Sequence, residues 1–311
     1  MTRRSVHVAL VLARWMRLVL LSLAVWLGLS ALCPVSASTL QALEDEALSD
    51  VAGQDGLAFN LRGFQMNGPM TLTYTSPDAD NPSMWMGNFW LSRSDDPDAT
   101  FSDPYRLYVY SRLGMSYVIQ LSNPQNANGM LKWQFAADFV VKANGSTFDG
   151  GAFILRDLTY YGGGLSITTP ADPHVQGVAF GVAMRVDIGN LIIRPQGRDD
   201  ITLADSATVP SQLNLAGIHL SDADDFTKPW VIADVTHQPG IFNAITDPDG
   251  TSYLHMGIDW SSSPNGAPKG RLVIDDISFK STDSAGDAST MSLGASRINT
   301  IQIQYLDVKF R

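Results

Sequence analysis

The chain has 311 residues with 21 basic and 31 acidic side chains, which gives it a formal charge of −10 at pH 7. This charge repels the phosphates of nucleic acids and the anionic surfaces of membranes, so we expect neither as a partner. The length is sufficient for one large β domain or for two smaller domains.

Residues 1–37 have the three parts of a secretory signal peptide. Four arginines precede an apolar stretch over residues 18–32, and the small residues from Val35 to Ala37 provide a cleavage site. The apolar stretch is shorter than the roughly 20 residues that a membrane-spanning helix needs. We therefore expect cleavage after Ala37 and export to the periplasm, the outer-membrane surface or the medium.

Cleavage would change the composition of the chain. The removed segment holds four of the 21 basic residues, none of the 31 acidic residues, and Cys33, the single cysteine. The remaining chain would have a formal charge of −14 and no thiol, so we expect its fold to depend on core packing and backbone pairing without disulfides. No later apolar run is long enough to predict an integral helical membrane protein.

Residues 38–56 predict a short helix followed by a glycine turn. Apolar residues recur at three- and four-residue spacing over residues 39–51, and Gly53 is placed to end the helix. Gly56 allows a second unusual backbone angle before the first strand. Because isolated helices of this length are marginal in water, we expect this helix to form by docking on another surface.

Residues 57–311 predict strands and turns. Short alternating runs are separated by clusters of turn-forming residues. These clusters are Asn67-Gly68-Pro69, Asn128-Gly129, Asn144-Gly145, Asp149-Gly150-Gly151, Gly162-Gly163-Gly164, Asp249-Gly250 and Asn265-Gly266. We expect an all-β, mostly antiparallel fold, built as a β-sandwich or a solenoid-like stack of bent strands. It forms one β-rich domain or two subdomains split near residues 145–150.

One local pattern recurs along this region: Φ-x-Φ-x-x-Φ-x-Φ, where Φ is apolar. In a flat strand the two-residue gap would send the two halves to opposite faces, whereas a bulge or corner in the gap keeps all four apolar residues on one face. Several copies start about thirty residues apart, which fits internal duplication; a sheet of bent strands gives the same pattern without it. The copies are residues 59–66, 153–160, 186–193, 213–220, 272–279 and 301–308.

The final residues, 301–311, also resemble the last strand of an outer-membrane β-barrel, because they alternate and end near an aromatic. Most of the expected strands are shorter than barrel strands, and aspartate-rich turns are many. The barrel remains an alternative.

The segment Leu40–Gly56 resembles the amino-terminal region of FilA-type putative pilus-system proteins, which are uncharacterised secreted proteins of Gram-negative bacteria. The family's mark is L-x-x-L-x-D-x-x-L-S-x-V-x-G-Q-x-G, and it is matched here at Leu48, Ser49, Val51, Gly53, Gln54 and Gly56. The resemblance implies a cell-surface or periplasmic structural component with pilus-like or adhesive partners. It implies no catalytic residue, since the family has no established reaction. The segment serves either as a recognition element for a partner or simply as turn chemistry.

The residues that usually carry catalysis form no familiar constellation. No Gly-x-Ser-x-Gly elbow and no phosphate-binding glycine loop is present, and the histidines that follow the signal peptide have no close metal-binding spacing. They are His174, His219, His237 and His255. We therefore expect a protein that is not an enzyme.

Aspartate clusters suggest calcium as the one possible cofactor, because carboxylates at alternate loop positions supply several of its oxygen ligands. The candidate ligands are Asp247 and Asp249 in one turn, and Asp222 and Asp224 in another. Ile258 stands where a calcium loop beginning at Asp247 would place its bidentate glutamate. Aspartate is also common in turns for its local hydrogen bonds, so both interpretations stay open.

Two aromatic clusters, residues 84–90 and 105–110, would either bind a sugar or a partner or fill the core. Together these features predict a non-enzymatic exported surface protein that belongs to a pilus-like or adhesive assembly and contacts its other proteins. The alternatives are an extracellular module that binds carbohydrate or calcium, and the outer-membrane barrel.

Overall fold

The computed structural model describes most of the chain that follows the expected helix. The predicted signal peptide and the predicted helix over residues 39–51 lie outside the described residues. The described residues are 56–59, 61–76, 82–98, 103–111, 117–127, 131–195, 198, 211–260, 263, 266–282 and 287–310.

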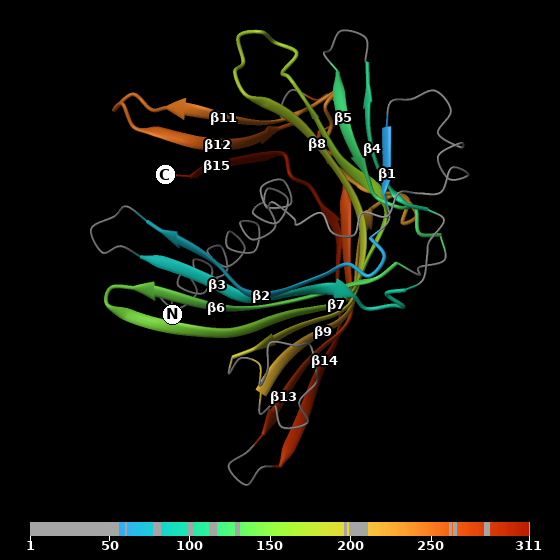
Figure 1. Ribbon diagram of the computed structural model, residues 1–311, viewed down its shortest axis with the longest axis vertical. Helices are drawn as coiled ribbons and strands as arrows, with labels where there is room; N and C mark the ends of the chain where they lie inside the picture. The colour runs from blue at the N-terminus through green and yellow to red at the C-terminus, as the bar shows by residue number, and fades with distance from the viewer. Residues whose placement is uncertain are drawn as a thin grey trace. The chain divides into compact units, whose positions relative to one another are not determined.

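These residues form fifteen β-strands and no helix, and every strand pairing is antiparallel, which confirms the all-β prediction (Figure 1). No described segment is thus a helix able to cross a bilayer. The first eight strands are β1 (Gly56–Phe59), β2 (Gln65–Thr75), β3 (Ser83–Arg93), β4 (Tyr105–Tyr110), β5 (Val118–Ser122), β6 (Trp133–Ala143), β7 (Ser146–Thr168) and β8 (Val178–Arg194). The others are β9 (Ser211–Asp222), β10 (Trp230–Ala233), β11 (Gly240–Thr246), β12 (Ser252–Asp259), β13 (Gly270–Thr282), β14 (Ala288–Ile301) and β15 (Tyr305–Phe310).

Two long strands, β7 and β8, form the spine of one branched sheet. They pair with each other from Ala152–Arg194 to Thr168–Ala179. The outer edge of β7 pairs with β6 along its first part and with β5 along its last part. The outer edge of β8 pairs with β10 and β11 near its start and with β9 farther on. Each spine strand therefore belongs to two sets of neighbours.

The sheet thus has two halves that share the spine (Figure 1). The order β2-β3-β6-β7-β8-β9-β13-β14 is called here the crease half. The order β1-β4-β5-β7-β8-β11-β12-β15, with β10 also on β8, is called the hollow half. A shift in the β7–β8 register between Tyr160 and Gly163 separates them.

Four copies of the repeated pattern lie on neighbouring strands of the crease half and match in register. One row of paired positions runs through Phe153, Ile193, Leu213 and Phe279. The two-residue gaps of the four copies fall at the same level, and Asp157 and Gly217 in these gaps have φ values of 53° and 61°. On β13 the register toward β14 shifts between Ile274 and Ile277. This confirms the corner expected in the gap, and the copies repeat sideways across one sheet.

The copy on β7 directs its apolar residues to a single core, as expected. Phe153 and Leu155 pack in a cluster built on β3 and β6. Leu158 and Tyr160 pack in a second cluster that adds β8. Leu91 contacts both clusters, so the two halves of the repeat face one continuous core despite the change of parity.

Three of the predicted turns are wrong, because their glycines lie inside strands. Residues 67–69 belong to β2, and residues 149–151 and 162–164 belong to β7. At each place a register shift marks a bulge, which glycines with positive φ allow without ending the strand. The turns at Asn144-Gly145 and Asp249-Gly250 are confirmed. The boundary considered near residues 145–150 lies at the β6–β7 hairpin, whose strands pair in one sheet.

Candidate functional site

The predicted recognition segment is described only at its last residue. Leu48, Ser49, Val51, Gly53 and Gln54 lie outside the described residues. Gly56 opens β1 and pairs with Tyr108. The unusual backbone angle predicted for Gly56 is wrong, because its φ is not positive. An added Cβ would lie 3.0 Å from the Cβ of Tyr108, so glycine here lets β1 and β4 approach closely.

The calcium candidates lie in two separate turns and act as turn residues. One oxygen of Asp222 accepts the N–H groups of Asp224 and Asp225 at 2.9 Å each. Asp249 accepts the N–H of Thr251 at 2.9 Å. No group of three or more His, Cys, Asp or Glu residues suited to a metal ion occurs within the described part of the chain.

The other calcium candidate of the β11–β12 turn, Asp247, pairs with Lys309. The ammonium of Lys309 lies 2.9 Å from a carboxylate oxygen of Asp247 and connects β15 to the β11–β12 hairpin. This hydrogen bond is the main reason that the pKa of Lys309 is raised. A cation at Asp247 would compete with this lysine.

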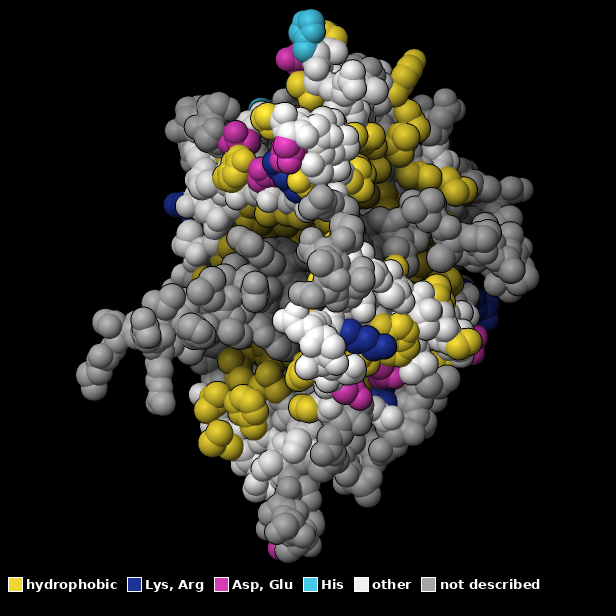
Figure 2. All heavy atoms as spheres, turned by 90° about the vertical axis from the view of Figure 1, so that its left-hand side faces the viewer, with side chains coloured by type: hydrophobic (Ala, Val, Ile, Leu, Met, Phe, Trp, Pro, Cys, Tyr) yellow, Lys and Arg dark blue, Asp and Glu magenta, His cyan; other side chains and the backbone are white. Residues whose placement is uncertain are grey.

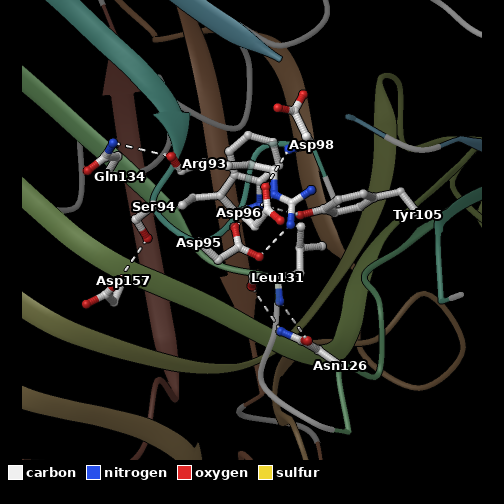
Figure 3. A network of polar contacts seen from close by, with 11 residues as sticks. Arg93, Ser94, Asp95, Asp96, Asp98, Tyr105, Asn126, Leu131, Gln134 and Asp157 are labelled. Atoms are coloured by element: carbon white, nitrogen blue, oxygen red, sulfur yellow. Dashed lines mark hydrogen bonds and ion pairs between the residues drawn. The ribbon is translucent and has the colours of Figure 1, made fainter. Parts of the chain in front are cut away.

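A polar network joins the end of β3 to β7 at Asp157, where the strand turns its corner (Figure 3). Arg93 is buried, and its guanidinium forms a bidentate pair with Asp95, with Nε donating at 2.8 Å. Ser94 donates to Asp157, the left-handed residue of β7, at 2.8 Å. Gln134 donates to the carbonyl of Arg93 at 3.3 Å. These contacts hold the end of β3 beside the corner of β7.

Aromatic side chains beside this network are held as neutral core groups. Trp133 donates its indole N–H to the hydroxyl of Tyr105 at 3.0 Å. Burial raises the pKa of Tyr105, and burial raises the pKa of Tyr160 to about 12. Asn126 and Leu131 exchange two hydrogen bonds of 3.0 Å. The network and its aromatic neighbours therefore stabilise the fold.

The two predicted aromatic clusters divide between core and surface. Phe89 is buried, Trp90 packs on a buried cluster, and Tyr105 joins the core. Tyr108 and Tyr110 lie farther along β4, with their rings tilted by 35° and 5.8 Å apart. The core explanation thus holds for three of the six aromatics, and Tyr108 lines a shallow hollow of the sheet.

The apolar face of the crease half continues to its last strand without a polar border. The row that contains Phe153 extends from Phe279 to Met291 on β14. Met291 and Leu293 are each 60% exposed. Apolar side chains gather in patches on the face drawn in Figure 2, with groups of charged side chains between them. Exposed apolar patches of this kind mark interaction surfaces.

β14 is an edge strand with little protection. Its residues are exposed on both faces along most of Ala288–Ile301, and β13 is its only pairing partner among the described strands. Arg297 is its one charged residue. Open strand edges present unpaired N–H and C=O groups, and proteins usually guard them with charges, proline, bulges or short length. β14 has this single arginine, a bulge at Gly294 and a second register shift between Ile298 and Ile301, and it contains no proline.

The other outer strands are shorter, and two of them carry proline or paired charges. β2 contains Pro69 and a bulge, β15 carries Asp307 and Lys309, and β1 has four residues. β14, with 14 residues and no proline, is therefore the longest open edge of the described sheet.

The hollow half also exposes apolar residues on the face that holds the core. Ile119 pairs with Ile167, which pairs with Phe180, so one apolar row crosses three strands. The exposed large residues of this half include Leu57, Leu107, Val109, Ile119, Val178, Phe242 and Leu254.

On the opposite face of the hollow half lies a shallow hollow of about 300 Å³. Glycines on β7 and β8 form its floor, with Tyr108 and Gln120 on one side and Asp234 on the other. The prediction of a turn at residues 162–164 concealed this feature. The available signal was the alternation that resumes at Leu165 and Ile167 directly after the glycines, which is typical of a strand that continues.

Comparison of the chain with family models, curated proteins and solved structures finds no match.

Proposed function

We propose that the protein is a non-enzymatic structural component of an exported surface assembly, of a pilus-like or adhesive kind, and that β14 joins it to a strand of a neighbouring subunit. The observation that carries this proposal is the open β14 edge, with Met291 and Leu293 exposed at the end of an apolar row. The expected export signal and the resemblance at Leu40–Gly56 support the location and the kind of assembly.

A strand added beside β14 would satisfy its outward backbone groups and extend the sheet, which is a common mode of protein recognition. It would also cover Met291 and Leu293, and removing apolar surface from water contributes about 25 cal/mol per Å². The single charge of β14, Arg297, leaves little electrostatic repulsion against an incoming strand. Backbone pairing and apolar burial therefore act together at this edge.

The edge also determines which assemblies are possible. Pairing of β14 with β14 of a second copy is isologous and closes at a dimer. Pairing of β14 with a different edge is heterologous and produces an open series. Sedimentation of the purified exported chain over a range of concentrations distinguishes the two arrangements.

The decisive experiment places charge on the edge. The double variant Met291→Lys, Leu293→Lys should fold, because both side chains are largely exposed, and its ammonium groups should block strand addition. In cells that express an epitope-tagged chain, the unaltered protein should sediment with sheared surface material, and the variant should be recovered mainly as free protein.

Thr73→Lys is the matched control, since it adds a lysine to the exposed outer strand β2. It should sediment like the unaltered chain. The proposal is overturned if the unaltered chain stays in the cytoplasm, or if the purified chain is monomeric at every concentration and sediments with no surface material.

A further inference from the structure

The hollow exists because small residues adjoin one another on β7 and β8. Ser166 pairs with Gly181, and Gly164 pairs with Ala183. Paired residues of neighbouring strands point to the same face, so these small positions form one low area. Gln120 pairs with Ser166 from the next strand, and its longer side chain rises beside the low area.

Backbone geometry accounts for part of this arrangement. Gly164 has a φ of 143°, and an added Cβ would lie 2.0 Å from the carbonyl oxygen of Leu121. Glycine is therefore required there. Ser166 and Ala183 have no positive φ, so the backbone does not require small residues at their positions. The hollow therefore includes small residues at positions where the backbone would also allow larger ones.

Polar groups converge on the hollow from both sides. Ser166 donates its hydroxyl to Gln120, which leaves the serine oxygen free to accept. The hydroxyl of Tyr108 accepts only a long contact of 3.5 Å from Ser122. On the opposite side stands Asp234, which lines the hollow from the end of β10.

Asp234 is the one charged residue among the described residues that line the hollow. Burial opposes its ionisation, but hydrogen bonds from the ring of His237 and from the backbone N–H of Thr236 outweigh it and lower the pKa of the Asp234 carboxyl. A carboxylate offers about four lone-pair sites, so it can accept further donors. The same charge repels anionic ligands.

These groups suit a ligand that is uncharged, rich in hydroxyl groups and partly apolar. Hydroxyls would donate to Asp234 and Ser166 and would exchange hydrogen bonds with the amide of Gln120. The ring of Tyr108 and the side chain of Val235 provide apolar contacts for C–H groups. A volume of about 300 Å³ lies at the small end of ligand sites, and the open side leaves an exit for a longer chain.

We propose that this hollow binds one neutral pyranose residue of a glycan. The proposal does not depend on β14, because the hollow lies in the other half of the sheet and on the opposite face. An adhesive protein would gain a sugar contact from it, and a protein outside any assembly would bind the same sugar.

The test is saturation-transfer NMR on the exported chain with the methyl glycosides of glucose, galactose and mannose, with N-acetylglucosamine, and with glucuronate and sialic acid as anionic probes. At least one neutral sugar should receive saturation at about 10 mM, and the anionic probes should receive none. Tyr108→Ala should weaken the dissociation constant of the binding sugar by about tenfold or more.

Two further variants keep the outcome clear. Gln120→Leu removes the amide at similar size and should also weaken binding by about tenfold. Tyr74→Ala removes an exposed tyrosine from β2, remote from the lining of the hollow, and should change nothing. The proposal fails if no neutral sugar binds, if glucuronate binds as well as the neutral sugars, or if the Tyr108 and Gln120 variants bind like the unaltered chain.

Discussion

The crease half and the hollow half share β7 and β8, yet they keep their apolar residues on one face of the sheet in different ways. In the crease half each shared strand changes parity at one level, and Leu158 and Tyr160 stay on the face of Phe153 because the backbone turns at Asp157. In the hollow half the strands alternate without this corner, as in the row from Ile119 to Phe180. A corner in one strand forces a corner in its neighbours, since paired strands must keep a common register.

The consequence of this difference is unequal packing of one apolar face. Near the corner the face is covered, and Leu158 is only 5% exposed. In the hollow half the same face leaves Ile119 45% exposed, and at the far end of the crease half Met291 is more exposed still. The corner concentrates the core beside the spine, and the outer strands remain open to partners.

The largest predicted effect tests this inequality directly. Leu158→Ala should lower the free energy of unfolding by about 2–5 kcal/mol, because it leaves a cavity in a packed cluster. Ile119→Ala should cost less than about 1 kcal/mol, because much of that side chain already meets water. Urea unfolding followed by tryptophan fluorescence measures both. Equal losses would show that the two halves are packed alike.

A smaller effect tests the corner itself. Gly217 has a left-handed φ of 61°, so Gly217→Ala should cost about 1–2 kcal/mol. The added Cβ would approach the carboxylate of Asp275, which is the movable end of a side chain and can shift. Gly217→Asn should cost less, because asparagine enters the left-handed region more readily, as Asn88 and Asn144 do in this chain.

Urea unfolding of the two Gly217 variants separates backbone strain from side-chain crowding. If asparagine is as costly as alanine, or costlier, crowding by Asp275 dominates and the corner is not set by this φ.

The sequence was sufficient for the fold class and for the corner, because both depend on local alternation. The apolar residues from Phe153 to Tyr160 reveal the change of parity without any knowledge of their neighbours. It was not sufficient for the course of β7. Gly162-Gly163-Gly164 has the composition of a turn, and only pairing with β5 and β8 makes it a bulge in a continuing strand.

The candidate surfaces were harder to predict from the sequence, because they too depend on which strands pair. Alternation along β4 places Tyr108 and the half-buried Tyr105 on opposite faces, but which face holds the core depends on the strands that flank β4. The openness of β14 is a property of sheet order, since nothing local shows that a strand has one neighbour. Asp222 and Asp247 were found as members of polar clusters, but only the structure shows that Asp222 accepts N–H groups of its own turn and that Asp247 pairs with Lys309 on β15.

The smallest predicted effect concerns one histidine in each half, because the two histidines differ in the number of carboxylates beside them. In the crease half His219 lies between two carboxylates, with Nδ1 2.8 Å from Asp187 and Nε2 3.5 Å from Asp275. In the hollow half His255 contacts the amide of Asn243 at 2.7 Å and one carboxylate, Asp307, at 3.1 Å. Burial disfavours the imidazolium of His219, but the two aspartates outweigh burial and raise its pKa.

A raised pKa means that the folded protein binds the proton of His219 more tightly than the unfolded chain does. The stabilisation is complete below the ordinary histidine pKa of about 6.5 and is lost as the pH rises through the higher folded value. Since the side chain of His219 is 45% exposed, its contribution should stay below about 1 kcal/mol. His219→Gln should therefore destabilise the protein more at about pH 5.5 than at about pH 8.5. Urea titrations at both values measure this, and Asp275→Asn should reduce the same pH dependence. A His219→Gln effect that is equal at both pH values would show that the two aspartates act on this histidine only as hydrogen-bond partners.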